Sequence, residues 1–290
     1  MASPSKTRLA FQYDGKLSRL KTHVHSVTPF AALEEGNRLL FKQGSDGDFV
    51  IVTNETIFHP QGGGQPSDEG IIKSVAAQNA PSSPDTHTSP PPPPPPSSSF
   101  QVKAVRMDAV HEGQVLHLGA FISPQHMASG DEVEQLLDQD KRLLYSRLHT
   151  AGHVLGSAVR SLLETQVPGF DELKASHFPD SAACEFHGAI EARWKEAIQA
   201  RVDEYVRGSM PVEIEFWTED DFRARGLARL IPDRRLLPPG EDRFRVVRIV
   251  GAEVYPCGGT HVERTDLCGE TRVKKIARSK GISRVSYTVS

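Results

Sequence analysis

One stretch organises the chain: QDKRLLYSRLHTAGHVLGSAVRSLLE, residues 139–164. Its apolar residues recur at intervals of three and four, and no proline interrupts it, which predicts an amphipathic helix of about seven turns. Two histidines of this stretch, His149 and His153, are four residues apart, so their side chains share one face of the helix about one turn from each other. Such a pair is either a structural feature of a helix or half of a metal site.

The residues that follow this helix predict further helices and a largely antiparallel sheet. Pro168-Gly169 ends the helix, and a second helical pattern covers residues 189–206. Strand-like segments cover residues 177–186, 211–217, 243–250 and 281–289. Helices packed on such a sheet define an α+β domain, which we place at residues 129–290. Cys184 then reads as a small buried residue in a strand, and Cys268 as a thiol without metal-binding neighbours.

The residues before the helix predict a small β-barrel-like domain at residues 8–128. Short β-branched and aromatic segments recur at the spacing of a barrel, at residues 48–53, 55–58, 70–75, 100–106 and 114–118. A proline- and serine-rich segment at residues 78–99 interrupts them, and we expect it to be a disordered insertion that cannot bury a core. Its proline run at 90–96 predicts polyproline II, which is either a tolerated insertion or a ligand for a proline-recognising partner.

Composition excludes some classes of protein and leaves one feature open. The 290 residues carry a net charge of −3, and no apolar stretch approaches the ~18 residues that span a bilayer, so we expect no membrane partner. Three cysteines are too few for a disulfide framework, which favours the cytoplasm. Between Arg223 and Arg248, eight arginines stand against three acidic residues, a local net charge of +5. That stretch is either a phosphate-binding face or a solvated surface.

A second pair of candidate ligands lies about a hundred residues after the histidine pair. The segment YPCGGTHV, residues 255–262, places Cys257 and His261 four residues apart. Three imidazoles and a thiolate suit a tetrahedral zinc ion, so His149, His153, Cys257 and His261 form the predicted metal site. Four protein ligands would make the zinc structural, whereas three would leave a position for water or substrate.

A glycine-rich segment is the third candidate for a functional element. IFHPQGGGQPSDEG, residues 57–70, places three successive glycines between predicted strands, where the backbone can approach a phosphate or a sugar closely. It contains neither the Walker pattern nor the dinucleotide-binding pattern. The alternative is a plain glycine-rich hairpin.

Taken together, the motifs FHPQGGGQPSD at 58–68, HTAGH at 149–153 and CGGTHV at 257–262 resemble those of the alanyl-tRNA editing proteins. These are free-standing relatives of the editing domain of alanyl-tRNA synthetase and kin of the second additional domain of threonyl-tRNA synthetase. The resemblance covers residues 8–290 apart from the insertion, and the chain is similar to the medium-length form. It departs from the family in having His59-Pro60-Gln61 before the glycines, where Tyr-Pro-Glu is usual, and Gly152 where larger residues are common.

The resemblance implies a trans-editing enzyme of translation. Such a protein hydrolyses the ester of mischarged tRNA(Ala), chiefly the seryl ester with the glycyl ester as a second candidate, and holds one Zn²⁺ through its His, His, Cys and His ligands. No GxSxG nucleophile pattern is present, which favours water, most simply a zinc-bound water, over a covalent intermediate. The oligomeric state stays open.

Substrate contacts are expected from three segments, with structural alternatives for some of them. Because serine differs from alanine by one hydroxyl, an editing site needs a placed hydrogen-bonding group, for which Thr150 and Gln65 are candidates. Thr150 could equally bond to its own helix backbone. The segment Lys174-Ala-Ser-His177 is similar to one that enters the family's pocket. The predicted substrate-binding residues are Gly62, Gly63, Gly64, Gln65, Thr150, Lys174, Ser176 and His177.

Two other functions agree with the same motifs. The chain could be a non-catalytic, zinc-stabilised module that binds tRNA through its arginine-rich stretch. It could also be a threonyl-type editing domain that acts on Ser-tRNA(Thr). The glycine-rich segment favours the alanine system over the threonine one.

Overall fold

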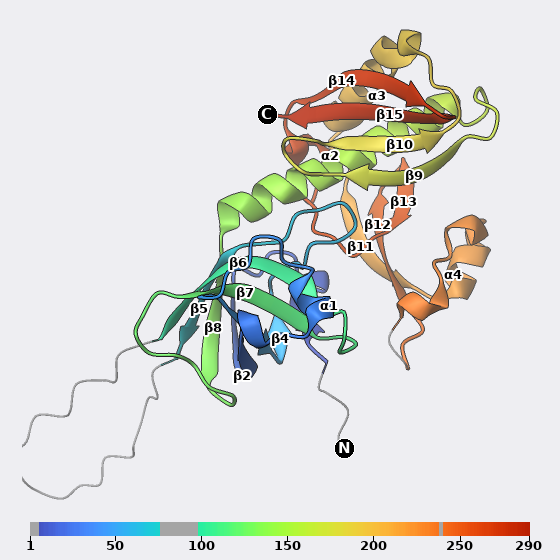
Figure 1. The fold of residues 1–290 in the computed structure, drawn as a ribbon. Helices are drawn as coiled ribbons and strands as arrows, with labels where there is room; N and C mark the ends of the chain where they lie inside the picture. The colour runs from blue at the N-terminus through green and yellow to red at the C-terminus, as the bar shows by residue number, and fades with distance from the viewer. Residues whose placement is uncertain (1–5, 76–97, 238–239) are drawn as a thin grey trace, which may run out of the picture. The chain divides into compact units, whose positions relative to one another are not determined.

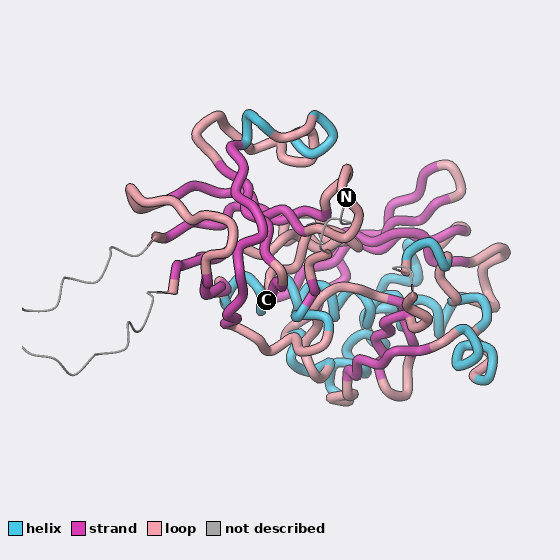
Figure 2. Tube along the Cα trace, turned by 90° about the horizontal axis from the view of Figure 1, so that it is seen from below, coloured by secondary structure: helices cyan, strands magenta, loops and turns pink. Residues whose placement is uncertain are grey.

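The computed structural model describes residues 6–75, 98–237 and 240–290, and these form two compact units. Unit 1 comprises residues 1–60 and 67–138, and unit 2 comprises residues 61–66 and 139–290. Strands and helices are both present in quantity (Figure 2), so the predicted α+β class is confirmed. The division differs from the expected boundary at 128/129, because the chain up to residue 138 pairs within unit 1 and the short segment 61–66 belongs to unit 2.

Unit 1 is built on a closed antiparallel barrel, which confirms the expected β-barrel-like domain. The order around the barrel is β2 (Arg19–Pro29), β3 (Phe49–Thr53), β7 (Val115–Phe121), β6 (Ser99–Met107), β5 (Gly70–Ser74) and β8 (Glu132–Leu137). A two-stranded parallel pair, β1 (Arg8–Leu9) and β4 (Glu55–Thr56), lies outside it. Apolar side chains such as Ile51, Ile72 and Phe100 are fully buried inside. The sequence did not predict β2 or β8, because polar residues fill much of both strands.

The proline-rich segment connects two neighbouring strands of the barrel. β5 pairs with β6 in an antiparallel register, with Lys73 opposite Ser99. The predicted end of the insertion at residue 99 is wrong, because Ser99 begins β6 and the Ser98 hydroxyl donates to Gln125 O at 2.7 Å. The rest of the predicted insertion, with the proline run at 90–96, lies outside the described residues.

The main layer of unit 2 is a four-stranded antiparallel sheet covered on one face by helices (Figure 1). The order is β14 (Thr271–Ser279), β15 (Ile282–Val289), β10 (Ala183–His187) and β9 (Asp171–Ser176). The covering helices are α2 (Gln139–Leu163) and α3 (Lys195–Arg207). Their apolar faces bury Leu155, Val159 and Ile198 against the sheet. The long helix is therefore present as predicted, and it ends one residue earlier.

A second, three-stranded antiparallel sheet completes unit 2. It consists of β11 (Val212–Trp217), β12 (Phe244–Ile249) and β13 (Glu253–Pro256). The helix α4 (Glu219–Ala224) follows β11 and begins with a capping box formed by Thr218 and Asp221. The remaining short helices are α1 (Glu35–Arg38) and 3₁₀ turns at Ala10–Gln12, Phe30–Ala32, Ala192–Trp194, Ala228–Leu230, Arg234–Leu236 and Thr265–Cys268. In the described ranges, every helix is too short or too polar to cross a membrane.

Two predicted elements of unit 2 are corrected by the structure. Only the last four residues of the strand expected at 177–186 are strand, as part of β10, because residues 177–182 form the turn between β9 and β10, in which Phe178 O accepts the Ser181 N–H. The second helix begins at Lys195 rather than residue 189, because the backbone N–H of Ile190 is bonded to the Ser283 hydroxyl and Ile190 is buried in the core. The sequence missed β14 altogether, since only Val273 of its nine residues combines an apolar side chain with full burial.

Candidate metal centre and pocket

Four donor side chains converge in unit 2. His149 and His153 come from neighbouring turns of α2, and Cys257 and His261 come from the glycine-containing loop after β13. One ligand atom from each lies within 4.8 Å of the others, so this cluster could hold a metal ion. The structure thus brings together the four residues that the two sequence motifs predicted as a set.

Hydrogen bonds fix which ring nitrogen of His149 faces the cluster. Its Nδ1 lies 2.7 Å from Gln65 Oε1, and the same oxygen accepts the Thr260 N–H at 3.0 Å. Because an amide oxygen only accepts, Nδ1 of His149 carries the proton and donates it. The lone pair is then on Nε2, which lies 3.5 Å from Cys257 Sγ.

His261 is oriented in the same way by a hydroxyl group. Thr150 Oγ1 donates its one proton to Ser146 O at 2.9 Å and accepts the Val262 N–H at 3.1 Å. It therefore accepts from Nδ1 of His261 at 3.1 Å, which leaves the lone pair on Nε2, 3.4 Å from Cys257 Sγ. Such outer hydrogen bonds fix the tautomer and ring orientation of metal-binding histidines.

The donor set meets the requirements of a zinc ion. The Nδ1 atom of His153 is buried without a hydrogen-bond partner in the described residues, an arrangement that costs free energy unless a ligand binds there. Burial, with smaller contributions from His177 and Arg245, lowers the pKa of His153 well below its usual value, so the ring is uncharged. Burial also raises the pKa of the Cys257 thiol, which a bound cation would reverse. Three imidazoles and one thiol match the ligand chemistry of zinc.

A cavity of about 470 Å³ adjoins the cluster within unit 2. Its wall combines glycines, imidazoles and two carboxylates: Gly63, Gly64, His149, Gly152, His153, Glu172, Leu173, Lys174, Ala175, His177, Cys184, Glu185, Tyr255, Pro256, Cys257 and Gly258. Four of the predicted substrate-binding residues therefore line it, namely Gly63, Gly64, Lys174 and His177. The other four do not.

Gln65 and Thr150 are outside this wall because the protein itself uses their polar atoms. Both side chains are fully buried. Gln65 donates from Nε2 to Thr260 Oγ1 at 2.8 Å while its oxygen serves His149, and Thr150 has the three partners given above. Their partners include His149 and His261, so both side chains orient members of the donor cluster. Sequence reasoning missed this role, since a contact between residues 195 positions apart leaves no local signal.

Of the remaining predicted substrate contacts, four lie in the cavity wall and two do not. Gly62 forms a tight turn with Gln65, and Ser176 lies 3.4 Å from the Ser181 hydroxyl rather than in the cavity wall. Lys174 is exposed and lies 3.6 Å from Glu185 across the cavity rim. Gly64 accepts the backbone N–H of His177 at 2.8 Å, so the glycine-rich loop is attached to the end of β9.

His177 is a buried member of the wall. Its Nδ1 lies 2.7 Å from the Tyr287 hydroxyl, which in turn donates to Leu148 O at 2.8 Å. Its ring stacks on that of His149, with the two centroids 4.2 Å apart. Burial lowers the pKa of His177 to about 4, so the ring is uncharged at neutral pH. Tyr287, which holds it, was not identified from the sequence.

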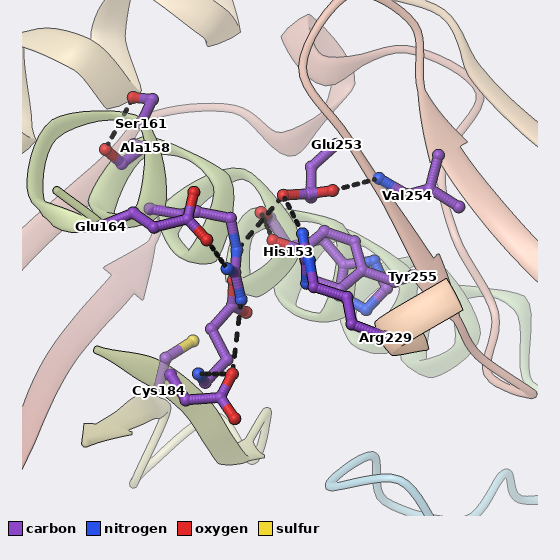
Figure 3. Close-up of polar contacts among 12 residues, drawn as sticks. His153, Ala158, Ser161, Glu164, Cys184, Arg229, Glu253, Val254 and Tyr255 are labelled. Atoms are coloured by element: carbon purple, nitrogen blue, oxygen red, sulfur yellow. Dashed lines mark hydrogen bonds and ion pairs between the residues drawn. The ribbon is translucent and has the colours of Figure 1, made fainter. Parts of the chain in front are cut away.

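A charged network that sequence reasoning also missed supports the other end of the cavity. Arg160 Nε lies 2.9 Å from Glu172 and 3.2 Å from Glu253, and the network extends to Glu164 and Arg229 (Figure 3). Burial raises the pKa of Glu172, and the Arg160 guanidinium opposes that rise. The network ties α2, β9 and β13 together around the wall.

The arginine-rich stretch, for which the sequence left a phosphate-binding face and a solvated surface open, carries many ion pairs. Seven of its eight arginines pair with carboxylates, many of them from residues 213–221; for example, Arg223 pairs with Glu219 and Arg234 also reaches Glu219. The eighth, Arg245, is buried and donates to Cys257 O. The local charge of +5 is thus largely balanced by carboxylates that the sequence count left outside the stretch.

The comparisons first define the class of protein. Residues 244–286 match the family model "Threonyl and Alanyl tRNA synthetase second additional domain". This segment runs from β12 into β15 and contains Cys257 and His261, so the second half of the donor cluster lies in a domain of that class.

Similarity over most of the chain then narrows the class. The "Alanyl-tRNA editing protein AlaX-L" of Pyrococcus horikoshii is 27% identical over 239 residues, which cover 82% of this chain and 50% of that protein. An "Alanine--tRNA ligase" of Desulfitobacterium hafniense is 28% identical over 245 residues, and one of Methanobrevibacter smithii 26% over 244, covering 83% and 84% of this chain and 24% of each ligase. The chain therefore spans half of the editing protein and about a quarter of each ligase. The chain is thus similar, at 26–28% identity, to an alanyl-tRNA editing protein and to alanine–tRNA ligases, in agreement with the resemblance of its motifs.

Proposed function

We propose that this protein is an aminoacyl-tRNA deacylase that removes a wrongly attached amino acid, chiefly serine, from tRNA(Ala), with one Zn²⁺ per chain. The observation that carries the proposal is the convergence of three imidazoles and a thiol beside a cavity, in a chain similar to an alanyl-tRNA editing protein. His149, His153, Cys257 and His261 hold the zinc ion. The protein works in the cytoplasm, where charged tRNA is used.

The reaction is the hydrolysis of one ester. Water adds to the carbonyl that joins the amino acid to the terminal ribose, the C–O bond breaks, and the products are the free amino acid and a tRNA with its ribose hydroxyl restored. A zinc ion held by the four donor residues would supply a Lewis acid beside the cavity when its coordination expands to a fifth position. Gln65 and Thr150 hold the rings of His149 and His261 in one tautomer, so the donors are preorganised. The uncharged ring of His177 and the glycines of the loop form the adjoining wall.

The preference for serine follows from the limited ability of a synthetase to exclude serine from its alanine-binding pocket. A pocket built for the methyl group of alanine rejects an added hydroxyl by only about a hundredfold. A second site that accepts serine and leaves alanine uncleaved corrects the error. Glycine lacks both the methyl and the hydroxyl group and is a possible second substrate.

The test measures metal and activity in the same samples. We expect purified protein to contain one zinc per chain by elemental analysis and to release serine from Ser-tRNA(Ala). Cys257→Ala is expected to lose both, because it removes the thiolate ligand. Cys268→Ala, a buried thiol outside the cluster, is the matched control and is expected to retain both. Full deacylation by a zinc-free Cys257→Ala protein would overturn the proposal.

Two outcomes of the same assay would favour other functions. Zinc-dependent binding of tRNA without release of serine would identify a binding module. Faster release of serine from Ser-tRNA(Thr) than from Ser-tRNA(Ala) would identify a threonyl-type editing domain, which the matched family model also includes.

A further inference from the structure

One nitrogen in the cavity wall is an acceptor without a partner. Tyr287 has a single hydroxyl proton, and it donates that proton to Leu148 O, since a carbonyl only accepts. The Tyr287 oxygen must then accept the proton of His177 Nδ1 at 2.7 Å. With its proton on Nδ1, the ring has its lone pair on Nε2, and the described residues supply no hydrogen-bond partner for Nε2.

Two glycines leave this nitrogen open to the cavity. A Cβ on Gly152 would overlap Cε1 and Nδ1 of His177, and a Cβ on Gly64 would come within 3.2 Å of Cδ2. Nε2 is the ring atom between Cε1 and Cδ2, so it lies between these two glycines, and both line the cavity. The stacked ring of His149 and the backbone bond from His177 N to Gly64 O hold the imidazole in place. His177 is only 2% exposed, so its acceptor is a fixed feature of the wall.

We propose that Nε2 of His177 accepts a hydrogen bond from the side-chain hydroxyl of a seryl ester and so distinguishes serine from alanine. The inference rests on the proposed deacylase function and names the specificity-determining atom of that site. A seryl hydroxyl satisfies the lone pair, whereas an alanyl methyl leaves a buried acceptor unpaired.

The other polar groups near the cavity are less suited to this task. Gln65 and Thr150 are occupied inside the protein. The wall carboxylates of Glu172 and Glu185 are each held by an arginine, Arg160 and Arg284. The ring of His177 also stacks on that of His149, with the two centroids 4.2 Å apart, so the proposed acceptor lies next to the donor cluster.

The direct test is binding of two hydrolysis-resistant analogues, adenosine with a 3′-linked seryl amide and adenosine with a 3′-linked alanyl amide. We expect the zinc-loaded wild-type protein to bind the seryl analogue about tenfold more tightly, which is what one neutral hydrogen bond provides. The ¹⁵N chemical shift of His177 Nε2 should change with the seryl analogue and not with the alanyl one.

Variants separate the acceptor from the rest of the ring. His177→Asn keeps a donor near the position of Nδ1 but has no atom at Nε2, so we expect it to bind both analogues equally. His177→Gln carries an amide that reaches the position of Nε2 and should recover part of the preference. Gly152→Ala keeps the imidazole but displaces it, and it should lose the preference as well. His187→Asn, at the exposed end of β10, is the matched control and should behave as wild type.

Zinc content and thermal unfolding of each variant establish that it is folded and loaded. Wild-type protein that binds the two analogues equally would overturn the inference and leave the deacylase function standing. If His177→Asn weakens binding of the seryl and alanyl analogues to the same extent, the inference is also overturned, because the ring would then contact a group that both analogues share. A seryl preference in a protein that deacylates no aminoacyl-tRNA would overturn the proposed function alone.

Discussion

Two histidines, one in each unit, share burial and differ in what their second nitrogen does. His117 in the barrel and His177 in the cavity wall are both almost fully buried, and burial lowers the pKa of each to about 4. In His117, Nδ1 lies 2.8 Å from Ile51 O and Nε2 lies 2.8 Å from Thr56 Oγ1, so both nitrogens have partners. In His177, only Nδ1 has one. A shifted pKa alone therefore does not mark a site, whereas an unpaired polar atom beside a cavity does.

The largest expected effect tests whether the donor cluster of unit 2 is a metal site. Zinc added to metal-free protein at a thousandfold excess over its Kd should stabilise unit 2 by about 4 kcal/mol, because it binds only the folded cluster. Hydrogen exchange measures this unit by unit: the amides of α2 should slow strongly, and those of β3 should stay unchanged. Equal slowing in both units would contradict a site confined to unit 2.

The second prediction concerns the fully paired histidine of unit 1. The unfolded chain binds a proton at His117 below pH 6.5 and the folded barrel only near pH 4, so stability from this residue is complete above 6.5 and is lost as the pH falls toward 4. The loss amounts to about 3 kcal/mol for a shift of this size. Roughly 2 kcal/mol of this is lost between pH 7 and pH 5, and hydrogen exchange of the barrel strands at these two pH values measures that part.

In that experiment His117→Gln should flatten the pH dependence, and His126→Gln, at an exposed position of the same unit, should not. An unchanged slope in His117→Gln would show that other groups account for the loss.

The third prediction compares two buried glutamines. Gln65→Ala should weaken zinc binding about 10- to 100-fold, since His149 loses the partner that fixes its tautomer. Gln135 in unit 1 is equally buried, and its side chain accepts from Ile57 N and donates to Thr53 and Glu55. Gln135→Ala should lower the stability of the barrel and leave zinc affinity unchanged. Titration with a competing chelator measures the affinity; a loss of zinc affinity in both variants would break the distinction.

The smallest effect is expected where charges already have partners. Arg234 and Arg235 are paired with Glu219 and Asp233. Replacing both arginines by alanine should leave the salt dependence of tRNA binding unchanged. The slope of log affinity against log salt concentration measures this, because each lost phosphate contact reduces the slope by roughly 0.7–0.9. If the slope falls by about the amount expected for two phosphate contacts, the arginine-rich stretch is a phosphate-binding face after all.

The sequence predicted features whose cause is local. The helix at 139–164 and the two donor pairs follow from spacings of three and four residues, and these agree with α2 and with the cluster. Strands with polar faces, such as β8 and β14, gave no apolar pattern and were missed.

The roles of Gln65, Thr150 and His177 could not be predicted in the same way, because each depends on hydrogen bonds between distant parts of the chain. The bond of Gln65 to Thr260 and that of His177 to Tyr287 join residues 195 and 110 positions apart. Thr150 forms the bond to its own helix backbone that the sequence left open as an alternative, but its contact with His261 depends on the folded chain.

The path of the chain through the glycine-rich loop limits how this protein can be divided. Residues 61–66 belong to unit 2, although the residues on both sides of them belong to unit 1, so the polypeptide passes between the units three times. A fragment that begins at Gln139 would carry all four donor residues and still lack Gln65, the acceptor for His149. Recombination or gene fission at residue 138 would therefore separate His149 from Gln65, which accepts its hydrogen bond, so the two units are expected to be inherited together.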